Sequence, residues 1–382
     1  MATSTGITKF IHHKGARLLY LDGGGVRGIV SLIILDNIMK RVQERKRLTE
    51  VPRPSDYFEL AAGTSAGGIT AIMLFWLHMT TEQAIEQYKS ISQEAFRPKI
   101  FGFGVPTWME GFVSSIKTVF TTRFDSTALD KAIDSVVERY GLDPDDKDEK
   151  REAPLYHSQH VGGGPPPVLQ NHRFHHTFVD KVLLKGQDEI TIGLTVRATS
   201  AAPTYFPEEV WKPDNIEDGL WESEGAKDGL KFWDGGLLNN NPINQLWYAR
   251  YDVVGPEESE PPISCVISLG TGRKDPGGQR PGLWVRLVDI ATSVVAFVSN
   301  TNAESQGFKR HMENLNRRPG YGDTKYIRLN PDLKQYNIGL ADYTKMRELE
   351  DLTIKYLQEE GTKESLQEAV EAICPLDDTP RH

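Results

Sequence analysis

The chain has 382 residues, which is long enough for one large or two modest domains with a full hydrophobic core. Its hydrophobic share of 38% and charged share of 25% are typical of a soluble globular protein, and its net charge of −9 argues against nucleic acid as the main partner. It contains 2 cysteines, Cys265 and Cys374, which exclude a disulfide framework and favour a reducing compartment. Cys265 lies in an apolar run, so we expect it to be a core residue rather than a reactive thiol.

The hydropathy of the chain predicts a protein that is neither secreted nor membrane-spanning. Residues 1–15 contain no apolar stretch of the kind found in a signal peptide, so we expect a cytoplasmic location. The most hydrophobic long segment, residues 283–298, is too short to span a bilayer comfortably and carries Arg286 and Asp289. Any membrane association is therefore expected to be peripheral.

The first regular element expected is a strand at residues 17–21, which leads into the glycine-rich segment 22–28, Asp-Gly-Gly-Gly-Val-Arg-Gly. A helix should follow, because apolar residues recur along residues 29–42. The glycines match the Gly-x-Gly-x-x-Gly pattern of dinucleotide-binding folds, but the next candidate acid, Glu44, lies at the end of this helix rather than after a second strand. A dinucleotide site is therefore a weak alternative. Consecutive glycine N–H groups also suit an oxyanion, because no side chains obstruct them.

The next motif is Gly63-Thr64-Ser65-Ala66-Gly67, a Gly-x-Ser-x-Gly pattern between an apolar run at 60–62 and an apolar segment at 69–77 with the length of a buried helix. A strand that reverses directly into a helix crowds its backbone, and glycines two residues either side of the serine remove the clashing Cβ atoms. The serine then projects at a helix N-terminus, where partial positive charge favours a developing anion. The pattern predicts either a nucleophilic serine or a turn whose serine caps the helix.

The segment between residues 81 and 140 is expected to hold two helices, at 81–96 and 127–140, the second introduced by the capping signal Asp125-Ser126. Residues 101–112 between them are rich in aromatics and glycines and lack helical periodicity. They are either a loop that covers the core or a flap that contacts lipid.

Residues 143–175 have the composition of a mobile surface insertion, because they join a charged run to a glycine and proline cluster. The acids of this segment lack the glycine and glutamate spacing of a calcium-binding EF-hand. Its histidines are accompanied by no cysteine pair. We therefore expect no metal.

Further strands are expected at residues 177–184, 190–196, 263–269 and 325–329, with mainly helix from residue 281 on. A short strand at 231–233 leads into Asp234-Gly235-Gly236, where a tight glycine turn would hold the acid in place. Asp234 is either a positioned catalytic acid or the acid of an Asx-turn that bonds its own backbone.

This alternation of strands and helices predicts an α/β layered domain with a largely parallel central sheet flanked by helices. We expect a single domain at residues 15–375. Ligands of such sheets bind at the carboxyl ends of the strands. The segments 22–28, 63–68 and 234–236 each follow an expected strand, so we expect them to meet at one edge.

A serine nucleophile needs a general base, and the sequence offers few histidines for that role. In the Ser…Asp…His order of α/β-hydrolases the histidine would follow Asp234, where only His311 and His382 occur. His311 lies on a charged helix face, and His382 is the last residue of the sequence. His78 lies more than two helical turns beyond Ser65 and should point away from it. The simplest assignment is a dyad in which Asp234 accepts the Ser65 proton.

The motifs at residues 22–28, 63–67 and 234–236, in this order, resemble those of the patatin-like phospholipase family, and the runs at 197–207, 240–242 and 268–272 are similar too. The resemblance covers residues 17–272 strongly and the helical tail to about residue 357 more weakly. It implies a layered patatin-like fold and a calcium-independent lipid acyl hydrolase without a cofactor.

For the site, the resemblance implies a catalytic dyad of Ser65 and Asp234. It also implies an oxyanion hole formed by Gly23, Gly24 and Gly25, with Arg27 contacting the anion or the phospholipid head group. The implied partner is a lipid at a membrane surface. Related chains are often fused to nucleotide-binding and repeat domains, so the chain is either a stand-alone enzyme or a domain under such control. Two other classes stay open: a dinucleotide-binding oxidoreductase and a catalytically silent lipid-binding or signalling module.

Overall fold

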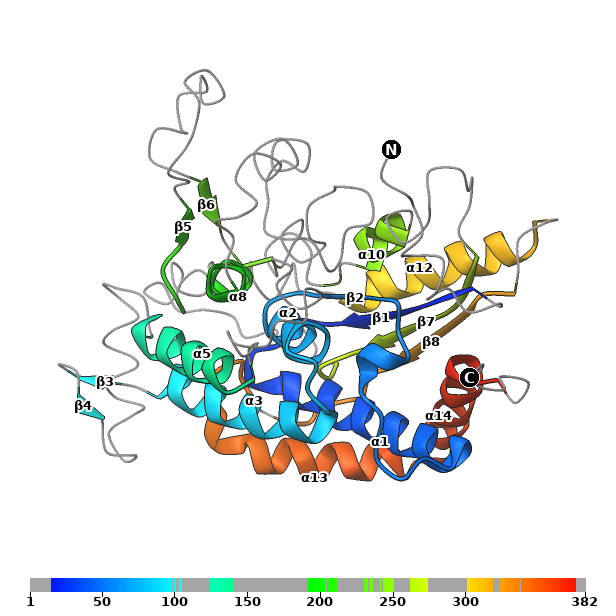
Figure 1. The fold of residues 1–382 in the computed structure, drawn as a ribbon, viewed down its shortest axis with the longest axis horizontal. Helices are drawn as coiled ribbons and strands as arrows, with labels where there is room; N and C mark the ends of the chain where they lie inside the picture. The colour runs from blue at the N-terminus through cyan, green and yellow to red at the C-terminus, as the bar shows by residue number, and fades with distance from the viewer. Residues whose placement is uncertain are drawn as a thin grey trace, which may run out of the picture.

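A four-stranded parallel sheet of order β2-β1-β7-β8 lies at the centre of the computed structural model (Figure 1). Its strands are β1 (Ala16–Leu21), β2 (Leu60–Gly63), β7 (Ile263–Leu269) and β8 (Lys325–Leu329). The structure describes residues 15–97, 99–100, 103–104, 124, 126–140, 192–202, 205–211, 230–232, 234–235, 241, 243–250, 262–273, 301–318, 323–336 and 338–375. The α/β class with a parallel sheet flanked by helices is confirmed.

Helices cover both faces of this sheet. One face carries α1 (Ile29–Lys46), α3 (Thr81–Phe96), α13 (Met346–Leu357) and α14 (Glu360–Ile373), and the other carries α10 (Ile243–Ala249) and α12 (Thr301–Asn316) (Figure 1). Successive side chains of a strand point to opposite faces, so Leu19 and Leu21 of β1 join the first core, whereas Leu18 and Tyr20 join the second. Every residue of β1 is buried, as expected for a parallel strand covered on both sides.

Cys265 illustrates how fully the sheet is covered. It is a completely buried residue of β7, and burial raises the pKa of its thiol to about 12. The side chain therefore stays uncharged and packs as a small apolar group, as the sequence predicts.

Two expectations drawn from the sequence are wrong. The segment at 190–196 was expected to be a strand, but the described part forms the helix α8 (Ile192–Ser200), despite its β-branched residues. Tertiary contacts override the weak local preference. α8 packs on α2 (Ala66–Ala71) and α5 (Ser126–Tyr140), and Arg197 pairs with Asp130 at 2.9 Å and with Glu209 at 3.3 Å.

The second error concerns the strand before Asp234. Strand β6 (Leu230–Phe232) exists, but it pairs antiparallel with β5 (Glu209–Trp211) in a separate two-stranded sheet. Asp234 therefore does not follow a strand of the central sheet. Its N–H instead donates to the carbonyl oxygen of Ala201, just after α8, at 2.9 Å.

The other expected elements fall into two groups. The helices expected at 29–42, 81–96 and 127–140 and the strands at 263–269 and 325–329 are present, within a few residues of the expected bounds. The segments 143–175 and 177–184 lie outside the described residues, as does most of 101–112. In and beside 101–112 the structure describes two short strands, β3 (Lys99–Ile100) and β4 (Phe103–Gly104). Within the described ranges, no helix combines the length and the apolar content needed to cross a membrane.

Backbone packs closely against backbone where the turn after β2 meets the end of β1. Leu21 of β1 is in register with Gly63 of β2, and α2 begins three residues after Gly63. A Cβ atom at Gly67 would overlap the carbonyl oxygens of Leu21 and Asp22, and one at Gly63 would overlap the carbonyl of Gly67. Only glycine allows this approach of backbone to backbone.

Gly67→Ala should therefore lower the free energy of unfolding by about 1–3 kcal/mol, because rigid backbone atoms must move to admit the methyl group. Gly307→Ala is the matched control. Gly307 lies inside α12, and a Cβ there meets nothing within 4 Å, so alanine should raise stability by about 0.5–1 kcal/mol. Urea denaturation followed by circular dichroism measures both. Changes of the same sign would contradict this account of the turn.

Candidate active site

Ser65 lies at the apex of the turn between β2 and α2, in a conformation that side chains rarely adopt. Its φ is 54° and its ψ is −121°, so the backbone is strained there. Its side chain makes no capping hydrogen bond to α2, so the interpretation of Ser65 as a capping residue is wrong. The turn is instead held from outside, because the N–H of Ser65 donates to the buried hydroxyl of Thr199 in α8 at 2.8 Å.

The glycine loop after β1 is fixed by three neighbours. The Thr271 hydroxyl donates to the carbonyl of Gly23 at 2.9 Å, and the Tyr88 hydroxyl donates to the carbonyl of Gly25. Gly25 has a φ of 53°, and a Cβ there would overlap the carbonyl of Leu340. Because C=O and N–H point in opposite directions across a trans peptide, the bond to Gly23 aims the N–H of Gly24 away from Thr271. Within the described residues, the N–H groups of Gly23, Gly24 and Gly25 make no backbone hydrogen bond.

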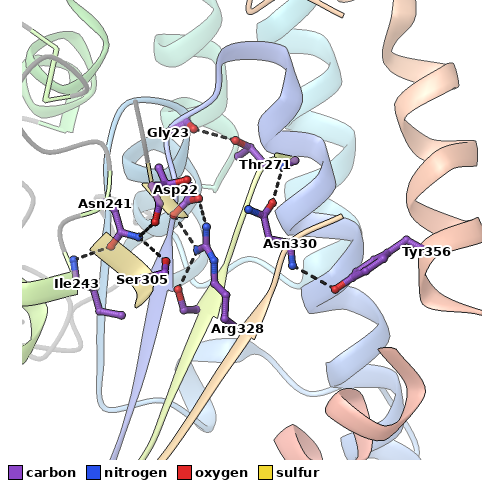
Figure 2. A network of polar contacts seen from close by, with 12 residues as sticks. Asp22, Gly23, Asn241, Ile243, Thr271, Ser305, Arg328, Asn330 and Tyr356 are labelled. Atoms are coloured by element: carbon purple, nitrogen blue, oxygen red, sulfur yellow. Dashed lines mark hydrogen bonds and ion pairs between the residues drawn. The ribbon is translucent and has the colours of Figure 1, made fainter. Parts of the chain in front are cut away.

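The first residue of this loop, Asp22, is buried and anchored to β8. Arg328 donates from Nη1 to Asp22 Oδ1 at 2.9 Å and from Nη2 to Asp22 Oδ2, and its Nη1 also donates to the Ser268 hydroxyl at 2.9 Å (Figure 2). Burial by itself lowers the pKa of Arg328, but the charge and hydrogen bonds of Asp22, together with Tyr326 and Tyr20, more than offset this, so the pKa is raised. Such a two-pronged pair fixes the carboxylate in position. Asp22 therefore acts as an anchor of the loop.

One cavity is lined by Ser65, Asp234, Arg27 and the loop glycines Gly23, Gly24 and Gly25. Asp234 is buried, with an exposed fraction of 6%. The rest of the wall is largely apolar and aromatic, and comes from α2, α3, α5 and the segment after α8. It includes Ile69, Ile91, Ala95, Phe96, Leu129, Tyr205 and Phe206. Although β6 lies outside the central sheet, the structure thus brings every predicted site residue to the same cavity.

Arg27 brings positive charge to this cavity, and none of the carboxylates that the structure describes forms an ion pair with it. Its Nε and Nη1 atoms are buried and make no hydrogen bond within the described part of the chain. Burial lowers the pKa of Arg27, while Asp22, Tyr205 and Tyr88 raise it, and the lowering prevails. A guanidinium with unused buried donors is suited to bind an anion.

The histidines that could compete for the role of base lie elsewhere. His78 is exposed, and its Nδ1 lies 3.3 Å from the Ser55 hydroxyl. His311 makes an edge-to-face contact with Trp247 and a tilted ring contact with Phe308 in a different cavity. Partial burial, followed by the charges of Arg250 and Arg318, lowers its pKa. Neither lines the cavity of Ser65. His382 lies outside the described residues, which also contain no cluster of three or more His, Cys, Asp or Glu side chains that could hold a metal.

Several residues that shape the site were not predicted as part of it. Thr199 and Thr271 lie in the runs 197–207 and 268–272, whose likeness to the family assigns no role to either threonine. Tyr88 and Leu340 carry no local signal at all, because α3 and the loop before α13 reach the glycine loop only in the folded chain.

A serine at a strained strand-to-helix turn of a parallel α/β fold, with a glycine loop beside it, is typical of folds of the serine hydrolase kind. Residues 19–247 match the patatin-like phospholipase family, and the chain belongs to that family.

The individual relatives have low sequence identity to this chain. The calcium-independent phospholipase A2-gamma of Mus musculus is 26% identical over 302 residues, which cover 75% of this chain and 32% of that protein. Patatin-like protein 4 of Arabidopsis thaliana is 28% identical over 267 residues, covering 67% and 59%. The cGAMP-activated phospholipase of Vibrio cholerae serotype O1 is 27% identical over 230 residues, covering 59% and 55%. The chain thus spans about a third of the length of the first relative.

The bond from Ser65 to Thr199 yields a prediction about the strained turn. Thr199→Val keeps the shape but removes the acceptor, so the free energy of unfolding should fall by about 1–3 kcal/mol. Thr199→Ser keeps the acceptor and loses one methyl group, which should cost only about 0.8 kcal/mol. Denaturant titration ranks the two variants. A serine variant that is less stable than the valine variant would show that the hydrogen bond does not support the turn.

Proposed function

We propose that this chain is a lipid acyl hydrolase that cleaves carboxylic ester bonds of phospholipids. The observation that carries the proposal is the single cavity lined by Ser65, Asp234, Arg27 and the glycine loop. Membership of the patatin-like phospholipase family supports it, as do relatives named as phospholipases. No described feature favours the dinucleotide alternative, since Glu44 lies within α1 and not at the end of a strand.

In the proposed reaction the Ser65 hydroxyl attacks the ester carbonyl while Asp234 accepts its proton. The N–H groups of Gly23, Gly24 and Gly25 stabilise the tetrahedral oxyanion. The alcohol of the head-group side leaves with the proton from Asp234, and an acyl ester on Ser65 remains. Asp234 then takes a proton from a water molecule that attacks this ester. The fatty acid is released as the proton returns to Ser65.

An aspartate is a weak base, because its reference pKa is about 3.9. It can accept a serine proton only where water is largely excluded and the product charge is stabilised. Asp234 is buried, and the cavity that it shares with Ser65 has mainly apolar walls, which supports this requirement. The same apolar wall suits an acyl chain.

The setting of the enzyme is part of the proposal. We place its substrate in a membrane surface that the protein contacts peripherally from the cytoplasm, and we treat residues 15–375 as one catalytic domain. Because the first relative is about three times longer than the matched region, control by fused nucleotide-binding or repeat domains stays a prediction.

The dyad is tested by Asp234→Asn and Ser65→Ala, each measured on phosphatidylcholine vesicles by mass spectrometry of released fatty acid. Asparagine keeps the shape but cannot accept a proton, so the rate should fall by about 10²–10⁴-fold. A fluorophosphonate probe should label the wild-type chain at Ser65 and fail to label Ser65→Ala.

His78→Ala, His311→Ala and excess EDTA are the controls for this assignment. Both histidines lie away from the cavity, so each variant should keep most of the activity, and a chelator should have no effect. If Asp234→Asn retained wild-type turnover while one of these controls abolished it, a histidine or a metal would be the catalytic group instead.

Arg27 yields a second test. We propose that its free guanidinium donors contact the phosphate of the head group, so Arg27→Lys and Arg27→Ala should reduce phospholipid turnover by about 10–100-fold. Turnover of an uncharged p-nitrophenyl ester should fall much less. Equal losses on both substrates would assign Arg27 to the oxyanion or to folding, and unchanged rates on both would remove it from the site.

A further inference from the structure

A second cavity, of about 500 Å³, is lined by Arg328 of the Asp22–Arg328 pair and shares no described lining residue with the cavity of Ser65. It lies beside the carboxyl ends of β7 and β8, which supply Arg273 and Asn330, and it extends along Tyr326 and Arg328 of β8. Helix α12 closes one side of it and Tyr356 of α13 another. Figure 2 shows Arg328, Ser305, Asn330 and Tyr356, which all line this cavity, in one polar network. The carboxyl edge of a parallel sheet is a common place for ligands.

The charged side chains described in the lining of this cavity are all positive. Its described lining contains the cations Arg273, Lys309, Arg328 and Lys334 and no carboxylate, although the whole chain carries a net charge of −9. Asp22, which does not line the cavity, forms an ion pair with Arg328 and neutralises its charge. Asp332 lies 3.7 Å from Arg273, but both side chains are about half exposed, so this pair is weak. Lys309 forms no ion pair within the described residues, so its positive charge can pair with a ligand.

Hydrogen-bond donors line the inner part of the cavity. The Nε of Arg328 is buried and has no partner within the described residues. The Ser305 hydroxyl accepts a bond from Asn241 Nδ2 at 2.9 Å. The buried Tyr326 hydroxyl lies beside Ser268 and Ser305 without a hydrogen bond of standard geometry. Buried donors without partners are costly unless a ligand uses them.

We propose that this cavity is a binding site for a phosphate-bearing ligand. Several cations facing one space suit an anion that carries more than one negative charge, and the donors around Arg328 match the many acceptor oxygens of a phosphate group. The volume exceeds that of an inorganic ion and falls in the range of small-molecule sites. The ligand is therefore a phosphorylated small molecule or the phosphate head group of a lipid.

The test uses Lys309→Gln and Arg310→Gln, both made in the full chain that also carries Ser65→Ala. Lys309 lines the cavity, whereas Arg310, one residue further along α12, does not. Both side chains are exposed, and both changes remove one positive charge, so the two variants should fold equally well. Calorimetric titration with pyrophosphate should show binding that Lys309→Gln weakens by about fivefold, as expected for one partly exposed charge pair, and that Arg310→Gln leaves unchanged.

Vesicles of phosphatidylcholine with and without phosphatidic acid identify the source of the phosphate. If only vesicles with phosphatidic acid bind, and Lys309→Gln alone weakens that binding, the site stands and takes a lipid head group. Equal affinities of both variants and the parent chain, or no binding of either probe by the parent, would overturn the proposal. Because every chain lacks Ser65, this result is independent of whether the hydrolase proposal holds.

Discussion

The close approach between the backbone of the turn at Ser65 and the carboxyl end of β1 is the constraint on which the site depends. Gly67 leaves no room for a side chain above Leu21 and Asp22, so the turn is in direct contact with the start of the glycine loop. Strand register adds to this, since Leu21 pairs with both Gly63 and Leu269. The serine and the loop glycines are therefore neighbours as a consequence of backbone packing, before any side chain contributes.

Arg27 and Arg328 are both partly buried near the glycine loop, but they differ in how their charge is satisfied, and the difference suggests different roles. Arg328 is paired through both terminal nitrogens with Asp22, which holds the loop to β8. Arg27 lies in the cavity with Nε and Nη1 unused within the described residues. A buried charge without a partner is unfavourable, so Arg27 has more to gain from an anionic ligand than Arg328 has. The proposed contact with a head-group phosphate follows from this contrast.

Asp234 does not reach the cavity from a strand of the central parallel sheet. Its strand β6 belongs to a small antiparallel pair, and its N–H is bonded to the residue that follows α8. Helix α8 also supplies Thr199, the acceptor for the Ser65 N–H. Helix α8 and the residue directly after it thus contact both members of the proposed dyad, so a shift of α8 would affect Ser65 and Asp234 together.

The sequence by itself determined the parallel α/β class and the bounds of α3, β7 and β8, because apolar periodicity is a local signal. Glycine spacing and the resemblance to the patatin-like family gave the candidate set of Ser65, Asp234, Gly23, Gly24, Gly25 and Arg27. Only the tertiary structure decided that residues 192–200 form a helix, since their packing on α2 and α5 outweighs β-branched propensity. The partners Tyr88, Thr271 and Leu340 were likewise invisible, because each is distant along the chain and contacts the glycine loop through geometry alone. Whether a charge is paired with a carboxylate, as in Arg328, or has donors without a partner among the described residues, as in Arg27, is a property of three-dimensional neighbours that no local pattern encodes.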